Sequence, residues 1–223
     1  MQAMWDRDSP LKQIPYFGPE LVSTANDAGY DLSFSFGRVQ KLIRYRVKDI
    51  LEFMDAMADD ATREGLLKAL NLNQRQLADI ANFTNNKYPN IDMEHELEDA
   101  ESVTAGAPAY IKVRIERDVD EDQEVDTSVH APFYPGNKME NWWLVVGEED
   151  SKSLLAIKKV TIQRRLEVRL EYVVPSAGHK KLTLSLMSDS YVGVDQEQQF
   201  EVDVAEGEEE ADGDEDEDEE MEG

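Results

Sequence analysis

The spacing of apolar residues changes near Asn90, and this change restricts the fold more than any other feature of the chain. Before Asn90, apolar residues recur at the spacing of one helix face. After it they alternate with polar residues, as Ile111, Val113 and Ile115 do within "PAYIKVRIER", which is the two-residue period of a half-buried strand. The sequence therefore predicts an α+β chain in which a helical part precedes an all-β part.

Short helices are expected before Asn90, because start and stop signals recur there. "FGPELVSTANDAG" has Pro19 near its start, and Gly29 stands where a left-handed C-terminal residue is favoured. "VKDILEFMDAM" offers Asp49 as N-cap with Glu52 three residues later, the pattern of a capping box. "DATREGLLKAL" is the next helix, and "NLNQRQLADIANFTNNKYP" is the last, with Asn73 as its cap.

About eight strands are expected after Asn90, with turn residues between them. The candidates are "IDMEHELED", "PAYIKVRIER", "SVHAPFY", "NWWLVVGEE", "SLLAIKKVTI", "RLEVRLEYVV", "KKLTLSLMS" and "QQFEVDVAE". Between them, "RDVDEDQEVD" is expected to be an acidic loop. Several short strands at such spacing predict a β-sandwich of immunoglobulin or fibronectin type III style.

Charge is concentrated at the end of the chain. Residues 206–223 hold 13 acidic residues and no basic one, half of the net charge of −26, and such a segment is expected to be a disordered acidic tail. A net acidic chain is a poor non-specific duplex binder, although a local RNA contact stays open.

Several classes of protein are disfavoured by what the sequence lacks. There is no cysteine and therefore no disulfide framework. No apolar run approaches the ~20 residues of a spanning helix, and "MQAMWDRDSP" lacks the order of a signal peptide. The motifs GxxxxGK[ST], HExxH, GxSxG and GxGxxG are absent. We therefore expect an intracellular soluble protein with no membrane contact, no catalytic residue and no cofactor.

Metal binding is also not expected. His95, His130 and His179 lie on separate expected elements without a ligand-like partner at i+3 to i+5, which favours surface or strand-edge roles. Residues 118–122 alternate aspartates as a calcium loop does, but Gln123 and Val129 replace the glycine and glutamate that such a loop requires.

Two adjacent tryptophans are the main candidates for a protein interface. Trp142 and Trp143 lie within one expected strand, so their side chains face opposite sides of it. One is expected in the core, and the other is a candidate anchor for a partner. Tyr191, in "MSDSYVGVDQE", resembles a corner residue that closes a sandwich and is a third interface candidate.

The stretch 30–46 is unlike the rest of the chain because it is basic and aromatic. The main expectation for it is a surface loop; if it instead has regular structure, the spacing of "FGRVQKLIRYR" predicts a short amphipathic helix with Val39, Leu42 and Ile43 on one side. Its basic residues are candidates for contact with RNA phosphates or with the acidic tail: Arg38, Lys41, Arg44 and Arg46. "IPYFGPELV" adds a weak resemblance to a helix-hairpin-helix, which presents backbone N–H groups to phosphate.

Four stretches together resemble a known family: "MQAMWDRDSPLKQIPYFGPELV", "LADIANFTNNKYPNIDMEHELED", "NWWLVVGEEDSKSLLAIKKVTI" and "LSLMSDSYVGVDQEQQFEVDV". They resemble the C-terminal Sec63 unit of the second cassette of the large spliceosomal RNA helicases of the U5 small nuclear ribonucleoprotein, which are Ski-two-like. The resemblance covers residues 1–29 and 47–205. It implies a helical bundle, a helix-loop-helix domain and an immunoglobulin/fibronectin type III-like sandwich.

The resemblance also implies function. The family unwinds paired U4/U6 RNAs with ATP in the nucleus, its motor lies upstream, and its second cassette serves regulation and docking. This chain would then be a non-catalytic docking module whose partners are spliceosomal proteins and the rest of the helicase cassette. A nucleic-acid-binding accessory module that acts through the helical hairpin and residues 38–46 is the alternative.

The family pattern divides the chain into domains. Residues 1–12 would be a remnant of the helical bundle, 13–89 the helix-loop-helix domain, 90–205 the sandwich and 206–223 the tail. In that pattern Gly29 joins Val47 directly, so residues 30–46 are expected to be an insert, either a lineage-specific loop or translated intron sequence. Tryptic peptides from within 30–46 in native protein would exclude the second origin.

Overall fold

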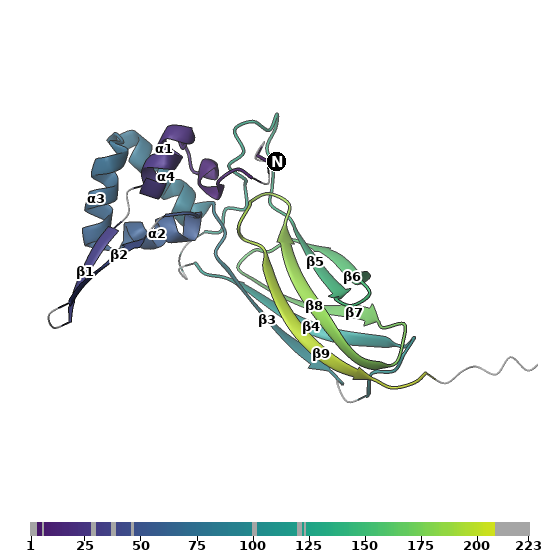
Figure 1. Ribbon diagram of the computed structural model, residues 1–223. Coiled ribbons are helices and arrows are strands. Elements are labelled where there is room, and N and C mark those ends of the chain that lie inside the picture. Colours follow the sequence, from purple (N-terminus) through teal and green to yellow (C-terminus); the bar gives the residue numbers. More distant parts are fainter. Residues whose placement is uncertain are drawn as a thin grey trace, which may run out of the picture.

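The structure is a computed structural model. It describes residues 4–5, 7–27, 30–36, 39–45, 47–99, 102–119, 122 and 124–207, without the side chains of residues 30–45 and Ala61. Helices occupy one end of the molecule and antiparallel sheets the other, so the fold is mixed α and β, as predicted (Figure 1). No helix in these ranges is long and apolar enough to cross a membrane.

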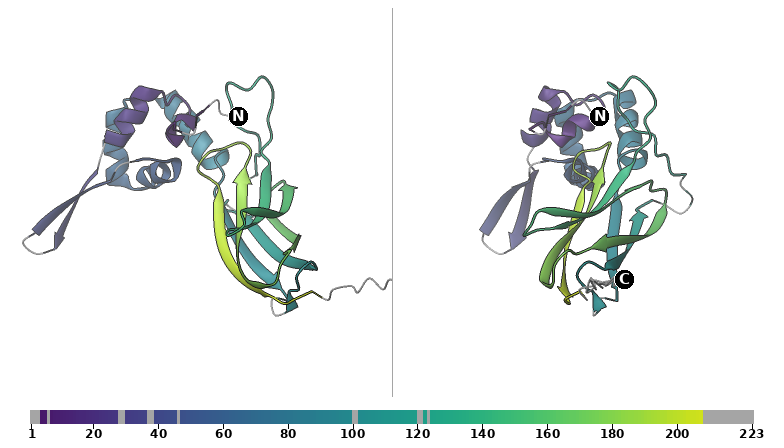
Figure 2. Two further views of the ribbon diagram at one scale, coloured as in Figure 1. Left: turned by 45° about the vertical axis from the view of Figure 1, so that its right-hand side comes forward. Right: turned by 90° about the vertical axis from the view of Figure 1, so that its right-hand side faces the viewer.

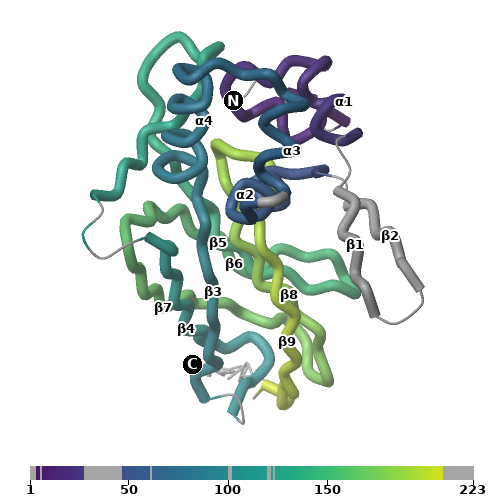
Figure 3. The backbone as a smooth tube through the Cα atoms, turned by 90° about the vertical axis from the view of Figure 1, so that its left-hand side faces the viewer, coloured from purple at the N-terminus to yellow at the C-terminus, as the bar shows by residue number. Residues whose placement is uncertain are grey.

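The helical part lies above one end of the sheets. A 3-10 turn, η1 (Pro10–Gln13), leads into α1 (Pro19–Asp27), and after a hairpin the chain continues through α2 (Ile50–Ala58), α3 (Asp60–Leu70) and α4 (Gln74–Asn86). Figure 3 shows α4 leading directly into the first strand of the sheets.

The helix starts follow the capping signals in the sequence. The Asp49 carboxylate accepts the Glu52 N–H at 2.8 Å, and the Glu52 carboxylate accepts the Lys48 N–H at 2.6 Å. Asn73 and Gln76 exchange the reciprocal bonds of a capping box, each at 3.0 Å. Both predicted N-caps are therefore confirmed.

The prediction of a helix in the basic stretch was wrong. Strand β1 (Tyr30–Phe36) pairs antiparallel with β2 (Val39–Tyr45), and the hairpin projects away from the helices (Figure 1). The spacing of Val39, Leu42 and Ile43 fits a helix, but a short apolar run does not distinguish the two structures. The two segments are each seven residues long, and every residue of one pairs with a residue of the other.

Seven further strands form two sheets that face each other as layers (Figure 2). The three-stranded sheet has the order β3 (Ile91–Glu98), β4 (Pro108–Arg117) and β7 (Arg165–Val173). The four-stranded sheet has the order β6 (Ser153–Val160), β5 (Trp142–Glu148), β8 (Gly178–Ser188) and β9 (Gln196–Val204). All neighbours are antiparallel.

One predicted strand is absent. Of "SVHAPFY", only Ser128 bridges to Met139, and the rest is a loop between β4 and β5. The Val129 N–H still donates to the Lys138 carbonyl at 2.8 Å, but Pro132 removes a backbone donor and Phe133 is exposed, so the pairing does not continue as a strand. The expected disorder of the tail concerns residues that lie outside the described ranges beyond Gly207.

The buried residues form one hydrophobic cluster that includes both parts of the molecule. The alternation of β4 is confirmed, because Ile111, Val113 and Ile115 are fully buried while their polar neighbours face outward. In the four-stranded sheet Trp142, Leu144 and Val146 have the same role. The inner faces of both sheets therefore supply the core.

Side-chain bonds fix the helices to the end of the sandwich. The Gln13 amide donates to the Val192 carbonyl at 2.9 Å and accepts the Val192 N–H at 2.8 Å. The Tyr88 hydroxyl donates to the same carbonyl at 3.2 Å. Phe83, Tyr88 and Tyr191 pack edge to face or tilted, with ring centroids 5.6–6.2 Å apart. These contacts hold the two parts in one orientation.

Candidate protein interface

The two tryptophans of β5 separate as strand geometry requires. Trp142 is fully buried, whereas Trp143 is 37% exposed on the outer face of the four-stranded sheet. Lys159 on β6 lies opposite Trp143, with its Nζ 5.9 Å from the ring centroid. Of the pair, only Trp143 has a ring that solvent can reach.

Tyr191 has a structural position. Its ring is buried, and its hydroxyl accepts the His130 backbone N–H at 3.0 Å. Burial raises the pKa of Tyr191 to about 12, so the hydroxyl stays protonated. The residue closes the corner between loop and helices, so the interface role expected for Tyr191 and Trp142 has no exposed ring to support it.

Trp143 belongs to a larger apolar surface. Met187 lies opposite it on β8, and Ile157 on β6 lies opposite Val145, the next outward residue of β5. Leu154 follows, opposite Gly147. We call this set the apolar face: Trp143, Val145, Leu154, Ile157 and Met187. Leu154, Ile157 and Met187 are between 45% and 59% exposed, and sequence reasoning did not single them out.

The outer face of the other sheet is charged and internally paired. Glu167 on β7 accepts Lys112 at 2.9 Å and Arg114 at 3.3 Å. Arg169 binds Glu98 at 2.7 Å and stacks over the Tyr110 ring at 3.4 Å from its centroid. We call this set the charged face: Glu96, Glu98, Tyr110, Lys112, Arg114, Glu116, Arg165, Glu167 and Arg169.

The two lateral edges of the sandwich, where the outermost strands of the two sheets lie, differ as well. On one side, the Gln198 amide of β9 donates to the Met93 carbonyl of β3 at 2.6 Å, and Gln196 donates to the Ile91 carbonyl. The Ala205 N–H adds a bond to the Val103 carbonyl at 2.8 Å. On the other side, the described residues contain no backbone bond from the outer edge of β6 to any strand.

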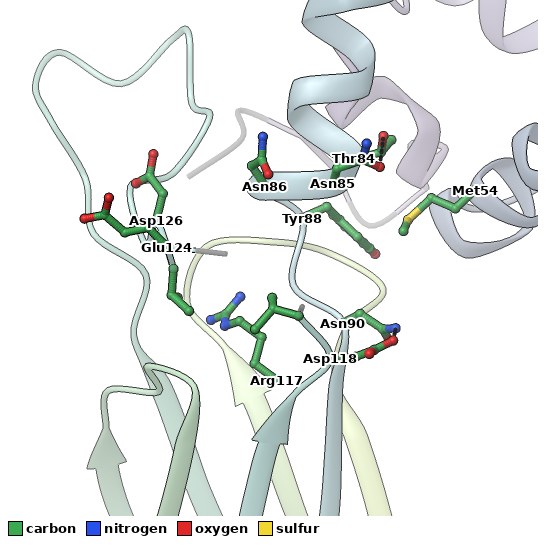
Figure 4. A pocket seen from close by; sticks show the side chains of 12 residues that line it. Met54, Thr84, Asn85, Asn86, Tyr88, Asn90, Arg117, Asp118, Glu124 and Asp126 are labelled. Carbon is green, nitrogen blue, oxygen red and sulfur yellow. Dashed lines mark hydrogen bonds between the residues drawn. The ribbon is translucent and has the colours of Figure 1, made fainter. Parts of the chain in front are cut away.

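The junction between helices and sandwich contains a polar pocket of about 270 Å³ (Figure 4). Its lining includes Tyr88, Arg117 and Asp126. Arg117 is neutralised by buried Glu140 and also donates to the Gln163 carbonyl at 3.1 Å. The charge of Arg117 is thus compensated within the protein by Glu140, which leaves the described lining of this pocket without an uncompensated cation.

Asp126 links this pocket to α4. Its carboxylate pairs with Lys87 and accepts bonds from Ser128, and these contacts lower the pKa of Asp126 to about 2. The Asp126 carboxylate therefore stays ionised at neutral pH, and its contact with Lys87 ties the loop to the end of α4.

The histidines lie on separate elements, as the sequence predicts. His95 on β3 bonds Gln198 of β9 at 2.6 Å, and His179 on β8 bonds Asp203, which raises the pKa of His179. Burial lowers the pKa of His130, whose ring packs against Phe83. Within the described ranges no three acidic or histidine side chains gather as a metal site.

Only two of the four basic residues predicted to contact RNA are among the described residues. Lys41 and Arg44 lie on β2, opposite Phe34 and Asp31 in the register of the hairpin. Arg38 and Arg46 lie outside the described residues.

Comparison with known proteins identifies relatives over most of the chain. The model of the Sec63 Brl domain family matches residues 1–201. Pre-mRNA-splicing factor brr2 of Schizosaccharomyces pombe is 44% identical over 199 residues, which are 89% of this chain and 8% of that protein. The human U5 small nuclear ribonucleoprotein 200 kDa helicase is 38% identical with the same coverage. The chain thus spans about 8% of the length of these relatives.

Among solved structures, the CARDB domain of the PF1109 protein from Pyrococcus furiosus has a TM-score of 0.36 and 11% identity. It covers 54% of this chain and 96% of its own, a similarity too low to bear on function. The family match and the identity to the splicing proteins confirm the resemblance that four sequence stretches carry. This chain belongs to the Sec63 Brl domain family.

Proposed function

We propose that this chain is a non-catalytic docking and regulatory module of a spliceosomal RNA helicase that acts in the nucleus. Its relatives are a pre-mRNA-splicing factor and U5 helicases, and the chain matches a small part of each. The observation that carries the docking role is the apolar face around Trp143, since exposed apolar patches mark interaction sites. Spliceosomal proteins and the rest of the helicase cassette are the proposed partners.

The finer assignment follows the family pattern. The chain would be the Sec63 unit of the second cassette, in an enzyme that unwinds U4/U6. Its division would be a bundle remnant at 1–12, a helix-loop-helix domain at 13–89, a sandwich at 90–205 and an acidic tail at 206–223. Sheets of three and four antiparallel strands support an immunoglobulin/fibronectin type III type for the sandwich.

The absence of catalysis is part of the proposal. In the family the ATP-driven motor lies in other segments, and the sequence of this chain carries no phosphate-binding loop. The chain alone should therefore show no ATPase activity above buffer in a coupled assay, with or without added RNA. Sustained turnover by the purified chain would overturn this assignment.

The docking role is tested by affinity purification from nuclear extract, with spliceosomal proteins identified by mass spectrometry. The baits are the intact chain, the chain without residues 206–223, and Trp143→Ser. We expect the first two to retain the same splicing proteins and Trp143→Ser to lose them. Phe133→Ser is the matched control, because Phe133 is 78% exposed on the loop between β4 and β5. Equal retention by all four baits would contradict docking through the apolar face.

RNA binding through the helical hairpin and the basic residues Arg38, Lys41, Arg44 and Arg46 remains the alternative proposal. It predicts RNA retention at low salt that falls steeply as salt rises, since phosphate contacts release counterions. A filter-binding assay at low ionic strength tests it directly. No retention of single-stranded or duplex RNA would dismiss this alternative.

A further inference from the structure

The edge strand β6 combines exposed apolar residues with exposed basic ones. Its sequence, "SLLAIKKV", contains two lysines and no acid. Lys158 and Lys159 are exposed, and neither has an ion-pair partner among the described side chains. Leu154 and Ile157 on the same strand are 59% and 54% exposed. β6 is thus an apolar strand with uncompensated positive charge.

The backbone of β6 is also available on one side. The strand ends the four-stranded sheet, and the described ranges contain no hydrogen bond that continues the sheet beyond it. The opposite side of the sandwich is closed by the glutamine bonds of β9 and by Ala205. An open edge offers a row of backbone donors and acceptors to an added strand.

Charge decides which strand fits. A second copy of β6 would bring lysines near lysines, and exposed lysines are a common protection of sheet edges against self-pairing. The neighbouring edge strand β7 is less suited, because Arg165, Glu167 and Arg169 already pair with other strands of their sheet. An incoming strand that carries acids beside Lys158 and Lys159 removes the repulsion and gains cross-strand pairs.

We propose that β6 is a docking edge for an extended acidic and apolar peptide segment of a partner protein, which adds as a fifth strand to the four-stranded sheet. Two adjacent acids would lie beside Lys158 and Lys159, and apolar residues at alternate positions would lie beside Ile157 and Leu154. Those apolar residues extend the apolar face past Trp143. The chain's own end, "EGEEEADGDEDEDEEMEG", has the charge but lacks the alternate apolar residues. The inference deepens the proposed docking function and rests on it.

The test uses the full chain and fluorescein-labelled peptides of about ten residues, the usual upper length of a strand. One peptide has two aspartates followed by valines at alternate positions, a second has lysines for the aspartates, and a third has only glutamates. We expect the first peptide to bind, with Lys158→Glu/Lys159→Glu weakening it by about tenfold. The lysine peptide should bind the double variant better than the native chain, and a cooperative urea transition would show that the variant is folded.

A matched control separates edge binding from net charge. Lys68→Glu/Arg75→Glu changes the charge by the same amount on the exposed surface of α3 and α4 and should leave affinity unchanged. Amide hydrogen exchange should slow in β6 when the first peptide is bound. Equal weakening by both double variants, equal binding of the glutamate peptide, protection elsewhere than β6, or self-association in place of peptide binding would overturn the inference. If splicing proteins still depend on Trp143 in that case, the docking function stands and the edge assignment alone fails.

Discussion

The outer faces of the two sheets belong to one sandwich, yet they interact with water in different ways. The three-stranded sheet exposes carboxylates, lysines and arginines that bind one another, and its aromatic Tyr110 is covered by Arg169. The four-stranded sheet exposes Trp143, Ile157 and Met187, and also Lys159, which has no acidic partner among the described residues. A face whose charges are satisfied gains little from a partner, whereas an exposed apolar face gains from burial. This difference is why we propose that the chain docks through the apolar face.

Strand β4 gives the sharpest test of this contrast, because it carries both exposed and buried charge. Glu140→Ala should cost about 3–5 kcal/mol of unfolding free energy, since it leaves buried Arg117 without its counter-ion. Glu116→Ala removes an exposed pair with Arg165 and should cost less than about 1 kcal/mol. Urea unfolding measures both. Equal losses of unfolding free energy would mean that burial does not determine how much an ion pair contributes to the stability of this sandwich.

The two lateral edges of the sandwich allow a second test, because among the described residues hydrogen bonds between the sheets close only one of them. Gln198→Ala removes the bond to the Met93 carbonyl and should cost about 1 kcal/mol. It should also speed amide exchange in β3 and β9, where the side is closed. Gln199→Ala, whose side chain lies on the outer face of β9 beside Glu149, is the control and should leave β3 unchanged. Unchanged exchange in the Gln198 variant would mean that the glutamines do not close this side.

Substitutions on the charged face should change the stability of the chain only slightly. Glu167→Ala breaks bonds to Lys112 and Arg114, yet these groups are half-exposed and solvent replaces the lost bonds. We expect a small drop in melting temperature that shrinks further at high salt. Thermal unfolding at low and high salt is the measurement. A large loss of stability that does not depend on salt would show that these ion pairs stabilise the sheet substantially.

The smallest expected effect concerns pH and the junction. The pKa of Asp126 in the folded chain is lowered to about 2, below its value in the unfolded chain. Its contribution is therefore present above about pH 4 and is lost as the pH falls toward 2. Because the side chain is half-exposed, Asp126→Asn should reduce stability at pH 7 by less than about 1 kcal/mol. The two chains should converge in urea unfolding near pH 2, and a constant gap would exclude the titration.

Local signals in the sequence predicted local structure well. Asp49 and Asn73 start helices because a cap needs only residues within one turn. The two-residue alternation predicted β4 for the same reason. The hairpin at Tyr30–Tyr45 was missed, since its pairing joins two segments whose separate patterns fit either structure.

The apolar face could not be predicted in the same way, because it is formed by residues that are far apart in the sequence. The sequence indicated that Trp142 and Trp143 face opposite ways, but only the placement of β5 between β6 and β8 decides which one is buried. Met187 and Ile157 join Trp143 through that sheet order, which no spacing in the chain reveals. The lack of acids in "SLLAIKKV" was the one sequence signal that would have drawn attention to β6.

The most direct measurement compares the two outer faces in one experiment. Isotope-coded affinity purification from nuclear extract would use the intact chain, Trp143→Ser/Met187→Ser on the apolar face, and Arg114→Ser/Glu167→Ser on the charged face. We predict that splicing proteins are lost from the apolar-face variant by at least about tenfold, the effect of one strong interface residue, and are retained by the charged-face variant. Retention by the apolar-face variant with loss from the charged-face variant would contradict the account.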